Sequence, residues 1–186
     1  MIRTTLAAAL CAALVGCGGY TTYPAPESGP GADAAFNSPN VAPGPDVIYT
    51  ALQYTIDRFP VDGPYALNLP PELSDKRVEY IFDLLDDPDA YSLTENTRDL
   101  PVYHVDRLWI RTTRAEVDVF RPVVDVPGPE GRQVTQRVTV NLEPRFARWR
   151  VVSARSSAIG LAPPPEPFFR ERNPSARADA TDAGTP

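Results

Sequence analysis

The sequence predicts an α+β fold in which two helices precede a four-stranded antiparallel sheet. Apolar residues between positions 46 and 86 recur at spacings of three and four, which is typical of amphipathic helices. From position 102 the spacing changes to two, which is typical of half-buried strands. Several links between these strands are short, and short links join antiparallel neighbours. We therefore expect an antiparallel meander with both helices packed on one face and solvent on the other.

The first predicted helix begins at Asp46, because an aspartate accepts hydrogen bonds from the free N–H groups of a first helical turn, and it ends before Pro60. Its apolar face consists of Ile48, Leu52, Ile56 and Phe59. The second predicted helix is capped by Ser74 and limited by Pro88. Its apolar face consists of Val78, Ile81, Phe82 and Leu85. Each helix thus has one face suited to packing against a sheet.

The segments on either side of the second helix carry weaker patterns. In the connector between the helices, Tyr65, Leu67 and Leu69 alternate with other residues, which is consistent with a short edge strand. Residues 89–100 are polar and rich in turn-forming residues, so turns are expected there.

Four strands are predicted over residues 102–111, 115–120, 134–142 and 147–154. The third is the clearest, with one apolar and one polar face. The apolar set is Val134, Val138, Val140 and Leu142, and the polar set is Thr135, Arg137, Thr139 and Asn141. The first strand is irregular, since Tyr103, Val105 and Trp109 fall on one face and Leu108 and Ile110 on the other. It is predicted to be bulged or covered on both sides.

This order of elements resembles that of the cystatin-like and NTF2-like superfamilies, in which a curved antiparallel sheet wraps a helix. The resemblance covers about residues 46–158 and rests on element order alone. Folds of this kind host unrelated functions, so it implies an architecture rather than an activity.

Both ends of the chain are rich in proline, which occurs 22 times in 186 residues. Residues 17–45 are predicted to be a tether of Pro, Gly and Ala, because such a segment buries too little apolar surface to offset its ordering entropy. Residues 46–160 are predicted to be the folded domain. Residues 161–186 are predicted to be a largely disordered tail, with 161–167 extended on the domain and Phe168 and Phe169 as its last anchor.

The N-terminus carries a secretion pattern. Arg3 precedes an apolar run from Leu6 to Val15, which is shorter than the about 20 residues that a membrane-spanning helix needs. Residues 1–16 are therefore predicted to be a signal peptide. The sequence Leu14-Val15-Gly16-Cys17 resembles the lipobox of bacterial lipoproteins, although Val15 and the single arginine depart from the commonest pattern.

The lipoprotein resemblance implies that cleavage precedes Cys17 and that its thiol carries diacylglycerol, with a further fatty acyl group such as palmitate on the new amine. Cys11 would be lost with the signal peptide, so no free thiol would remain. Two or more acyl chains anchor a protein stably. The chain is therefore expected in the cell envelope, with its membrane contact through Cys17. Gly18 is not the aspartate that retains such proteins at the inner membrane, which favours the outer membrane.

The sequence contains no recognisable catalytic set, and no cofactor or metal site is expected. The net charge of −6 argues against nucleic-acid binding. No nucleophile elbow and no phosphate-binding glycine loop is present, and His104 is the only histidine. The acidic run Asp83–Asp89 lacks the alternation and the glycine of an EF-hand loop, so the sequence leaves open whether it binds calcium.

The candidate binding residues lie on the predicted solvent face of the sheet. Arg137, Arg148 and Arg150 form cross-strand ion pairs with Glu116 and Asp118, or else Arg148 and Arg150 on the last strand form a basic stripe for an anionic partner. His104 and Asp106 share a predicted face two residues apart, where they are either structural or at the mouth of a pocket.

Three functions follow from these patterns. The first is an envelope lipoprotein whose domain binds or scaffolds an envelope protein without catalysis. The second is an NTF2-like cup for a small molecule, with an enzymatic role for His104 and Asp106 left open. The third is a purely structural spacer in the envelope. A deep pocket that holds His104 and Asp106 would favour the second, whereas a filled core with a flat charged patch would favour the first.

Overall fold

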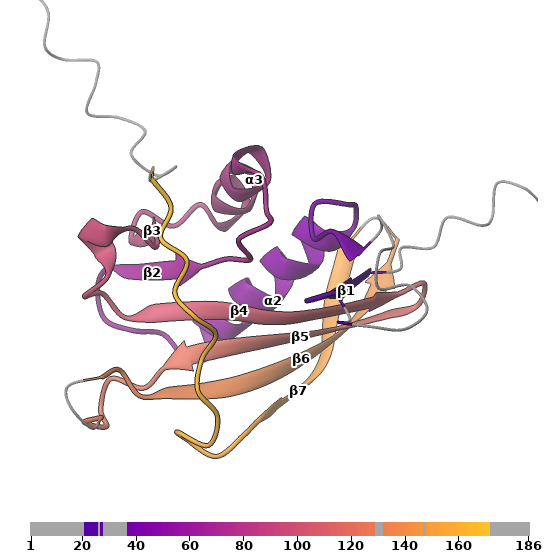
Figure 1. Cartoon of the computed structure of the whole chain (residues 1–186). Helices are drawn as coiled ribbons and strands as arrows, with labels where there is room; N and C mark the ends of the chain where they lie inside the picture. Colours follow the sequence, from indigo (N-terminus) through magenta and orange to yellow (C-terminus); the bar gives the residue numbers. More distant parts are fainter. Residues whose placement is uncertain (1–20, 26, 28–36, 129–131, 147, 172–186) are drawn as a thin grey trace, which may run out of the picture.

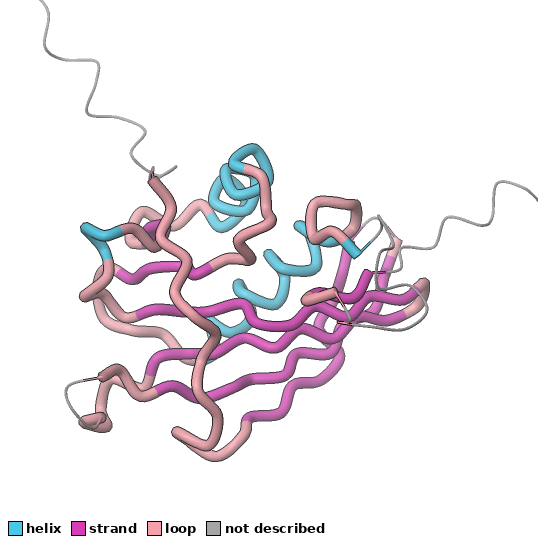
Figure 2. The backbone as a smooth tube through the Cα atoms, in the orientation of Figure 1, coloured by secondary structure: helices cyan, strands magenta, loops and turns pink. Residues whose placement is uncertain are grey.

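The computed structural model describes residues 21–25, 27, 37–128, 132–146 and 148–171. Within these residues the chain forms two α-helices and seven strands, shown in Figures 1 and 2. The helices are α2 (Gly44–Arg58) and α3 (Asp75–Leu85). The strands are β1 (Thr21–Tyr23), β2 (Tyr65–Asn68), β3 (Ala90–Ser92), β4 (Val102–Arg111), β5 (Arg114–Pro122), β6 (Thr135–Arg145) and β7 (Arg148–Ser156).

The predicted four-stranded antiparallel meander is wrong, because the strands form one seven-stranded mixed sheet. Its order is β3-β2-β4-β5-β6-β7, and β1 pairs with β4 outside this path. Strands β4 to β7 are antiparallel neighbours, as the short links predicted, but β2 pairs in parallel with both β3 and β4. Helix α3 connects β2 to β3, which is the crossover that a parallel pair requires.

Of the three additional short strands, β2 lies where Tyr65, Leu67 and Leu69 alternate, but it is an interior strand between β3 and β4 and not the edge strand that this pattern suggested. All four residues of β2 are buried, so no polar face marks it. β3 has three residues and lies in the segment where only turns were expected. β1 lies within the proline-rich stretch predicted to be a tether, and it pairs antiparallel with β4 from Thr21↔Ile110 to Tyr23↔Leu108. These strands are held by their partners rather than by local propensity.

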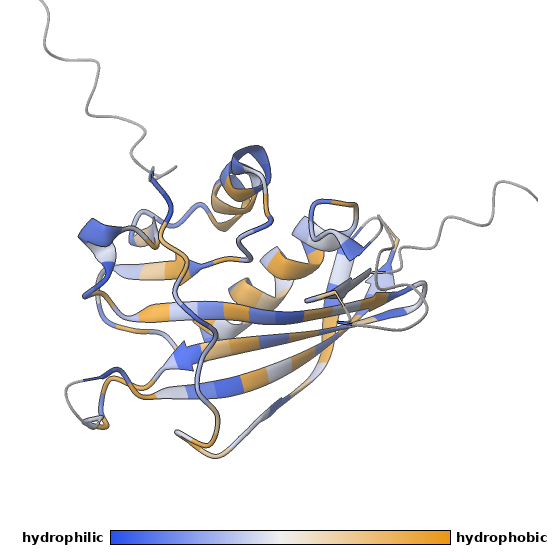
Figure 3. Ribbon diagram, in the orientation of Figure 1, coloured by the Kyte–Doolittle hydropathy of each residue, from blue (hydrophilic) through white to orange (hydrophobic). Residues whose placement is uncertain are grey.

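The core lies between the helices and the inner face of the sheet. α2 packs across β4 to β7, and α3 packs against α2. Figure 3 shows the apolar stripe of α2 and the alternation of apolar and polar residues along the strands. The largest fully buried side chain, Tyr103, donates its hydroxyl hydrogen to the carbonyl oxygen of Phe59 at 2.6 Å, so the end of α2 is tied to β4.

A bulge at Asp106 explains the two-faced pattern of β4. Val105 pairs with Val119 and Arg107 with Asp118, which leaves Asp106 as an extra residue. An extra residue reverses the alternation beyond it. The apolar residues on both sides of the bulge therefore face the same core: Tyr103, Val105, Leu108 and Ile110, all less than 5% exposed. Trp109 faces the opposite side of the sheet.

The segment Leu161–Glu171, here called the strap, crosses the outer face of the sheet in front of β4 and β5 (Figure 1). Asn68 holds it, donating from Nδ2 to the Glu166 carbonyl at 3.1 Å and accepting from the Phe168 N–H at 3.0 Å. Arg170 donates its N–H to the Leu93 carbonyl at 2.9 Å. Its guanidinium also donates to the carbonyl oxygens of Pro70 and Leu73.

Residues 161–167 lie extended on the domain, where the sequence led us to expect them, but the contacts that hold the strap differ from those predicted. Phe168 and Phe169 were predicted as its last anchor, yet they are 40% and 39% exposed. Polar contacts of Asn68 and Arg170 hold the segment instead, and such contacts leave no signal in an apolar pattern. Residues 172–186 lie outside the described residues.

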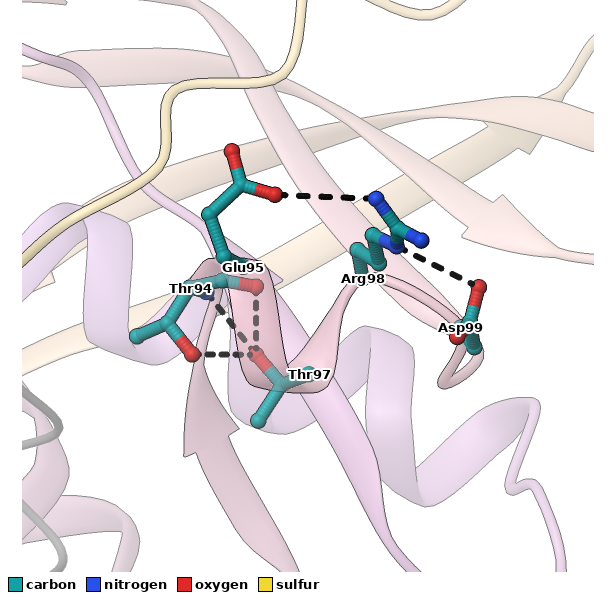
Figure 4. Close-up of polar contacts among 5 residues, drawn as sticks. All are labelled: Thr94, Glu95, Thr97, Arg98 and Asp99. Carbon is teal, nitrogen blue, oxygen red and sulfur yellow. Dashed lines mark hydrogen bonds and ion pairs between the residues drawn. The ribbon is translucent and has the colours of Figure 1, made fainter.

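The loop between β3 and β4 contains a short 3₁₀ turn, Glu95–Thr97, shown in Figure 4. Thr94 and Thr97 form a capping box, in which the Thr94 N–H donates to the Thr97 hydroxyl at 2.8 Å. Arg98 lies 3.8 Å from both Glu95 and Asp99, in ion pairs that are largely exposed to solvent. Exposed pairs contribute about 0–1 kcal/mol, so this cluster shapes the loop and does not form a site.

Candidate functional site

The candidate site is a hollow on the outer face of the sheet, where the strap does not cover it. This polar hollow has a volume of about 390 Å³ and lies over β4 to β7. Its lining residues are Asp106, Arg107, Asp118, Arg137, Thr139, Arg155, Ser156 and Ser157. A second hollow of about 560 Å³ adjoins it at Arg107 and includes Trp109.

In one part of the polar hollow, the charged side chains are already paired with each other. Asp118 is 3% exposed, and it accepts hydrogen bonds from the Arg107 Nε at 3.0 Å and from the Thr139 hydroxyl. Arg107 also forms an ion pair with Glu116 through Nη2. The predicted cross-strand ion pairing of Glu116 and Asp118 thus exists, but Arg107 of β4 is the partner.

The other part carries two guanidinium groups without such partners. Within the described residues, neither Arg137 nor Arg155 makes a hydrogen bond or an ion pair through its side chain. Arg155 lies opposite Thr139 in the register of β6 and β7, and Arg137 lies two residues from Thr139 on β6. Two guanidinium groups that line one hollow are suited to a carboxylate or a phosphate, because each offers a planar set of donors.

Asp106 is the remaining charged group of the polar hollow. Partial burial raises the pKa of its carboxyl, and the nearby carboxylate of Asp118 raises it further. Arg137 and Arg107 act in the opposite direction by favouring the ionised form. Asp106 therefore competes with an external anion for Arg137, and less so once it is protonated.

The other predicted site residues lie away from this hollow. Arg148 and Arg150 are exposed near the start of β7, where Arg150 stands opposite Glu143. Arg148 borders a groove of about 590 Å³ between β7 and the two helices, next to Trp149. The structure thus brings Arg137 and Asp106 together and leaves Arg148 and Arg150, the predicted basic stripe, outside the polar hollow.

His104 lies under the strap and does not line the polar hollow. Its side chain is buried, with Nδ1 at 3.0 Å from Nδ2 of Asn68. Burial lowers the pKa of the imidazole to about 4, so it is neutral at physiological pH. The bulge at Asp106 and the strap together separate the two residues that the alternation placed on one face.

Arg155 is the site residue that sequence reasoning missed. The last strand was predicted to end at Ala154, but β7 continues to Ser156. A register shift between Asn141 and Leu142 of β6 changes the alternation along β7. Arg155 consequently faces the same side as Arg150, although five positions separate them. An irregularity of this kind has no signature in the period-two pattern.

The acidic run at the end of α3 is used inside the fold. Asp87 accepts hydrogen bonds from the Tyr65 hydroxyl at 2.7 Å and from the Asp89 N–H at 2.9 Å. Asp86 adopts a left-handed conformation at φ 48° and ends the helix. No group of three or more His, Cys, Asp or Glu side chains in the described part of the chain is placed to hold a metal ion.

Residues Leu14–Cys17, which resemble a lipobox, lie outside the described residues. Among the helices that the structure describes, none has the length and hydropathy required to span a membrane. Comparison of the chain with protein-family models, with curated proteins and with solved structures finds no match in any of the three.

Proposed function

We propose that this chain is a lipid-anchored protein of the bacterial cell envelope whose domain binds an anionic partner without catalysis. The observation that carries the binding role is the pair Arg137 and Arg155, which line one hollow and make no side-chain hydrogen bond or ion pair within the described residues. The anchoring role rests on the lipobox resemblance at Leu14–Cys17.

The geometry of the polar hollow supports a binding role rather than acid–base chemistry. A general base must lie within hydrogen-bond reach of its substrate. His104 is buried at 5% exposure, lies 3.0 Å from Asn68 and does not line the hollow, so it is not placed to act on an anion held there. The hollow is also open to solvent, which suits a charged group on a macromolecule better than an enclosed small molecule.

The binding role predicts that loss of both guanidinium groups weakens the affinity for a carboxylate-rich probe. We expect Arg137→Gln with Arg155→Gln to reduce binding of hexaglutamate by about tenfold, because each charge-assisted contact contributes about 1 kcal/mol or more. Asp106→Asn should strengthen binding, since it removes the competing carboxylate. Isothermal titration calorimetry at low ionic strength measures both effects.

The matched control is Arg98→Gln, because Arg98 is an exposed arginine that already pairs with Glu95 and Asp99. It removes the same charge from the chain and should leave hexaglutamate binding unchanged. Equal affinities of the wild type and the double variant would contradict a binding role for the polar hollow.

The anchoring role predicts a lipid-modified mature chain. Protein purified from the membranes of its native host should begin at Cys17 and carry the added mass of acyl chains, measured by mass spectrometry. Cys17→Ala should retain the signal peptide and lose that mass, because the modified thiol is absent. A mature chain from those membranes without acyl mass would contradict the anchor.

A further inference from the structure

We propose that the free edge of β7 binds an extended acidic polypeptide segment by strand addition. This inference rests on the proposed function, since it assigns the anionic partner a chemical class and a place on the sheet. The site is a sheet edge in which backbone groups provide hydrogen bonds and arginines provide selectivity.

β7 is an edge strand throughout its length. The order of the sheet ends at β7, and within the described residues β7 pairs with β6 alone. None of its nine residues is buried, in contrast to the neighbouring strand β6. Figure 1 shows it at the margin of the sheet, with the strap leaving from its end and crossing the other strands. Long exposed edges favour pairing with a further strand.

The backbone groups that face the free edge follow from the pairing with β6. The N–H of Ser157 donates to the carbonyl oxygen of Arg137 at 2.9 Å, so these two residues form a hydrogen-bonded pair. Bonded and non-bonded pairs alternate in an antiparallel ladder. The next pairs, Val138↔Ser156 and Val140↔Ala154, place Ser156 and Ala154 at non-bonded positions. Both residues therefore direct their N–H and C=O groups away from β6.

The charge of β7 selects the partner. The strand Arg148–Ser156 contains three arginines and no acidic residue. Arg150 and Arg155 face the outer side of the sheet, where a strand added at the edge would place alternate side chains opposite them, and Arg148 borders the groove beside the helices. Carboxylates at alternate positions of the added strand would be stabilised there by about 0.2–1 kcal/mol per pair.

The same charges disfavour a second copy of this chain as the occupant. Antiparallel pairing of two β7 strands would bring two arginine-bearing strands together without any carboxylate in either. Like charges opposite each other destabilise a sheet. Charge complementarity thus favours a separate acidic segment over self-pairing.

The test uses the full chain and a synthetic eight-residue peptide in which glutamate alternates with valine. On addition of this peptide, the backbone amides of Ala154 and Ser156 should become protected from hydrogen exchange, as followed by NMR. The same peptide with lysine in place of glutamate should bind about tenfold more weakly, which corresponds to about 1.4 kcal/mol. Neither measurement requires a variant to fold.

A backbone variant separates strand addition from general charge attraction. Ser156→Pro removes an N–H that faces the free edge and retains every arginine, and proline is tolerated at such edge positions. It should weaken binding of the glutamate peptide several-fold relative to Ser156→Ala, whose backbone is intact.

Two outcomes would overturn strand addition while leaving the proposed function intact: binding of the glutamate peptide without protection of those two amides, or equal affinities of Ser156→Pro and Ser156→Ala. Binding to phosphatidylglycerol vesicles without binding to the glutamate peptide would also overturn it, and would assign the arginines to lipid headgroups. Undiminished hexaglutamate binding by the Arg137 and Arg155 double variant would instead count against the proposed function.

Discussion

Deletion of residues 161–186 is expected to destabilise the domain by about 4 kcal/mol, because the strap is part of its folded structure. The deletion removes the hydrogen bonds that Asn68, Leu93 and Pro70 make with strap residues, each of which contributes about 1 kcal/mol. It also leaves the amide of Asn68, which is 4% exposed, without two of its partners.

The outer face beneath the strap supplies the remainder of this effect. His104 and Phe120 stand opposite each other in the register of β4 and β5, and both face outward. They are nevertheless buried, and the strap crosses the outer face of the strands that carry them, β4 and β5. Exposure of a buried phenylalanine costs about 1.5–3 kcal/mol. The folded domain no longer has to order the strap, and this saving in conformational entropy offsets part of the destabilisation.

Urea denaturation followed by circular dichroism measures the change in the free energy of unfolding. The matched control is deletion of residues 172–186, which leaves Glu166, Phe168 and Arg170 in place and should leave the free energy unchanged. If the protein that lacks residues 161–186 were as stable as the protein that lacks residues 172–186, the strap would contribute nothing to the stability of the fold.

The domain should also lose stability on acidification through a single imidazole. Burial lowers the pKa of His104 to about 4 in the folded state, against an ordinary value of 6.5. As the pH falls, His104 is therefore protonated in the unfolded chain before it is protonated in the folded chain. Protonation of His104 thus favours unfolding. The contribution of neutral His104 is fully present above pH 6.5 and is lost as the pH falls towards 4.

The expected loss between pH 7 and pH 4 is on the order of 3 kcal/mol, at about 1.4 kcal/mol per unit of pKa difference. His104→Gln should remove this dependence, since an amide does not titrate and can still accept the hydrogen bond from Asn68. Urea denaturation of both proteins at several pH values measures it. The same pH dependence in the variant and the wild type would show that His104 is not its source.

Asp106 acts in the opposite direction over part of this range. Its pKa is raised in the folded state, so its contribution to stability increases as the pH falls through that value. The difference between the wild type and His104→Gln isolates the imidazole, because Asp106 is present in both proteins.

Local periodicity was sufficient for the regular elements. The apolar spacing of Ile48, Leu52 and Ile56 identified α2, and the alternation from Val138 to Leu142 identified β6, because each of these elements buries one face. β2 is buried along its whole length and β3 is three residues long, so neither shows a two-residue alternation between a buried and an exposed face. Their parallel pairing depends on contacts between segments distant in the sequence.

The candidate site could be predicted only in part. Arg137 and Asp106 were identified because they lie on polar positions of recognisable strands. Arg155 was missed, and the choice between a structural and a pocket position for His104 stayed open, because a bulge in β4, a register shift beside β7 and a strap from the chain end rearrange these faces. Each of these features depends on pairing across strands, which one strand's sequence does not specify.

Amino-acid order by itself determined the positions of α2, α3 and the four longest strands, and it supplied the resemblance of Leu14–Cys17 to a lipobox. Tertiary structure alone decided the mixed sheet, the burial of His104 and the convergence of Arg137 with Arg155. The physical reason is that periodicity indicates which side of one element is buried. Strand register and the covering strap decide which residues of other elements each side contacts.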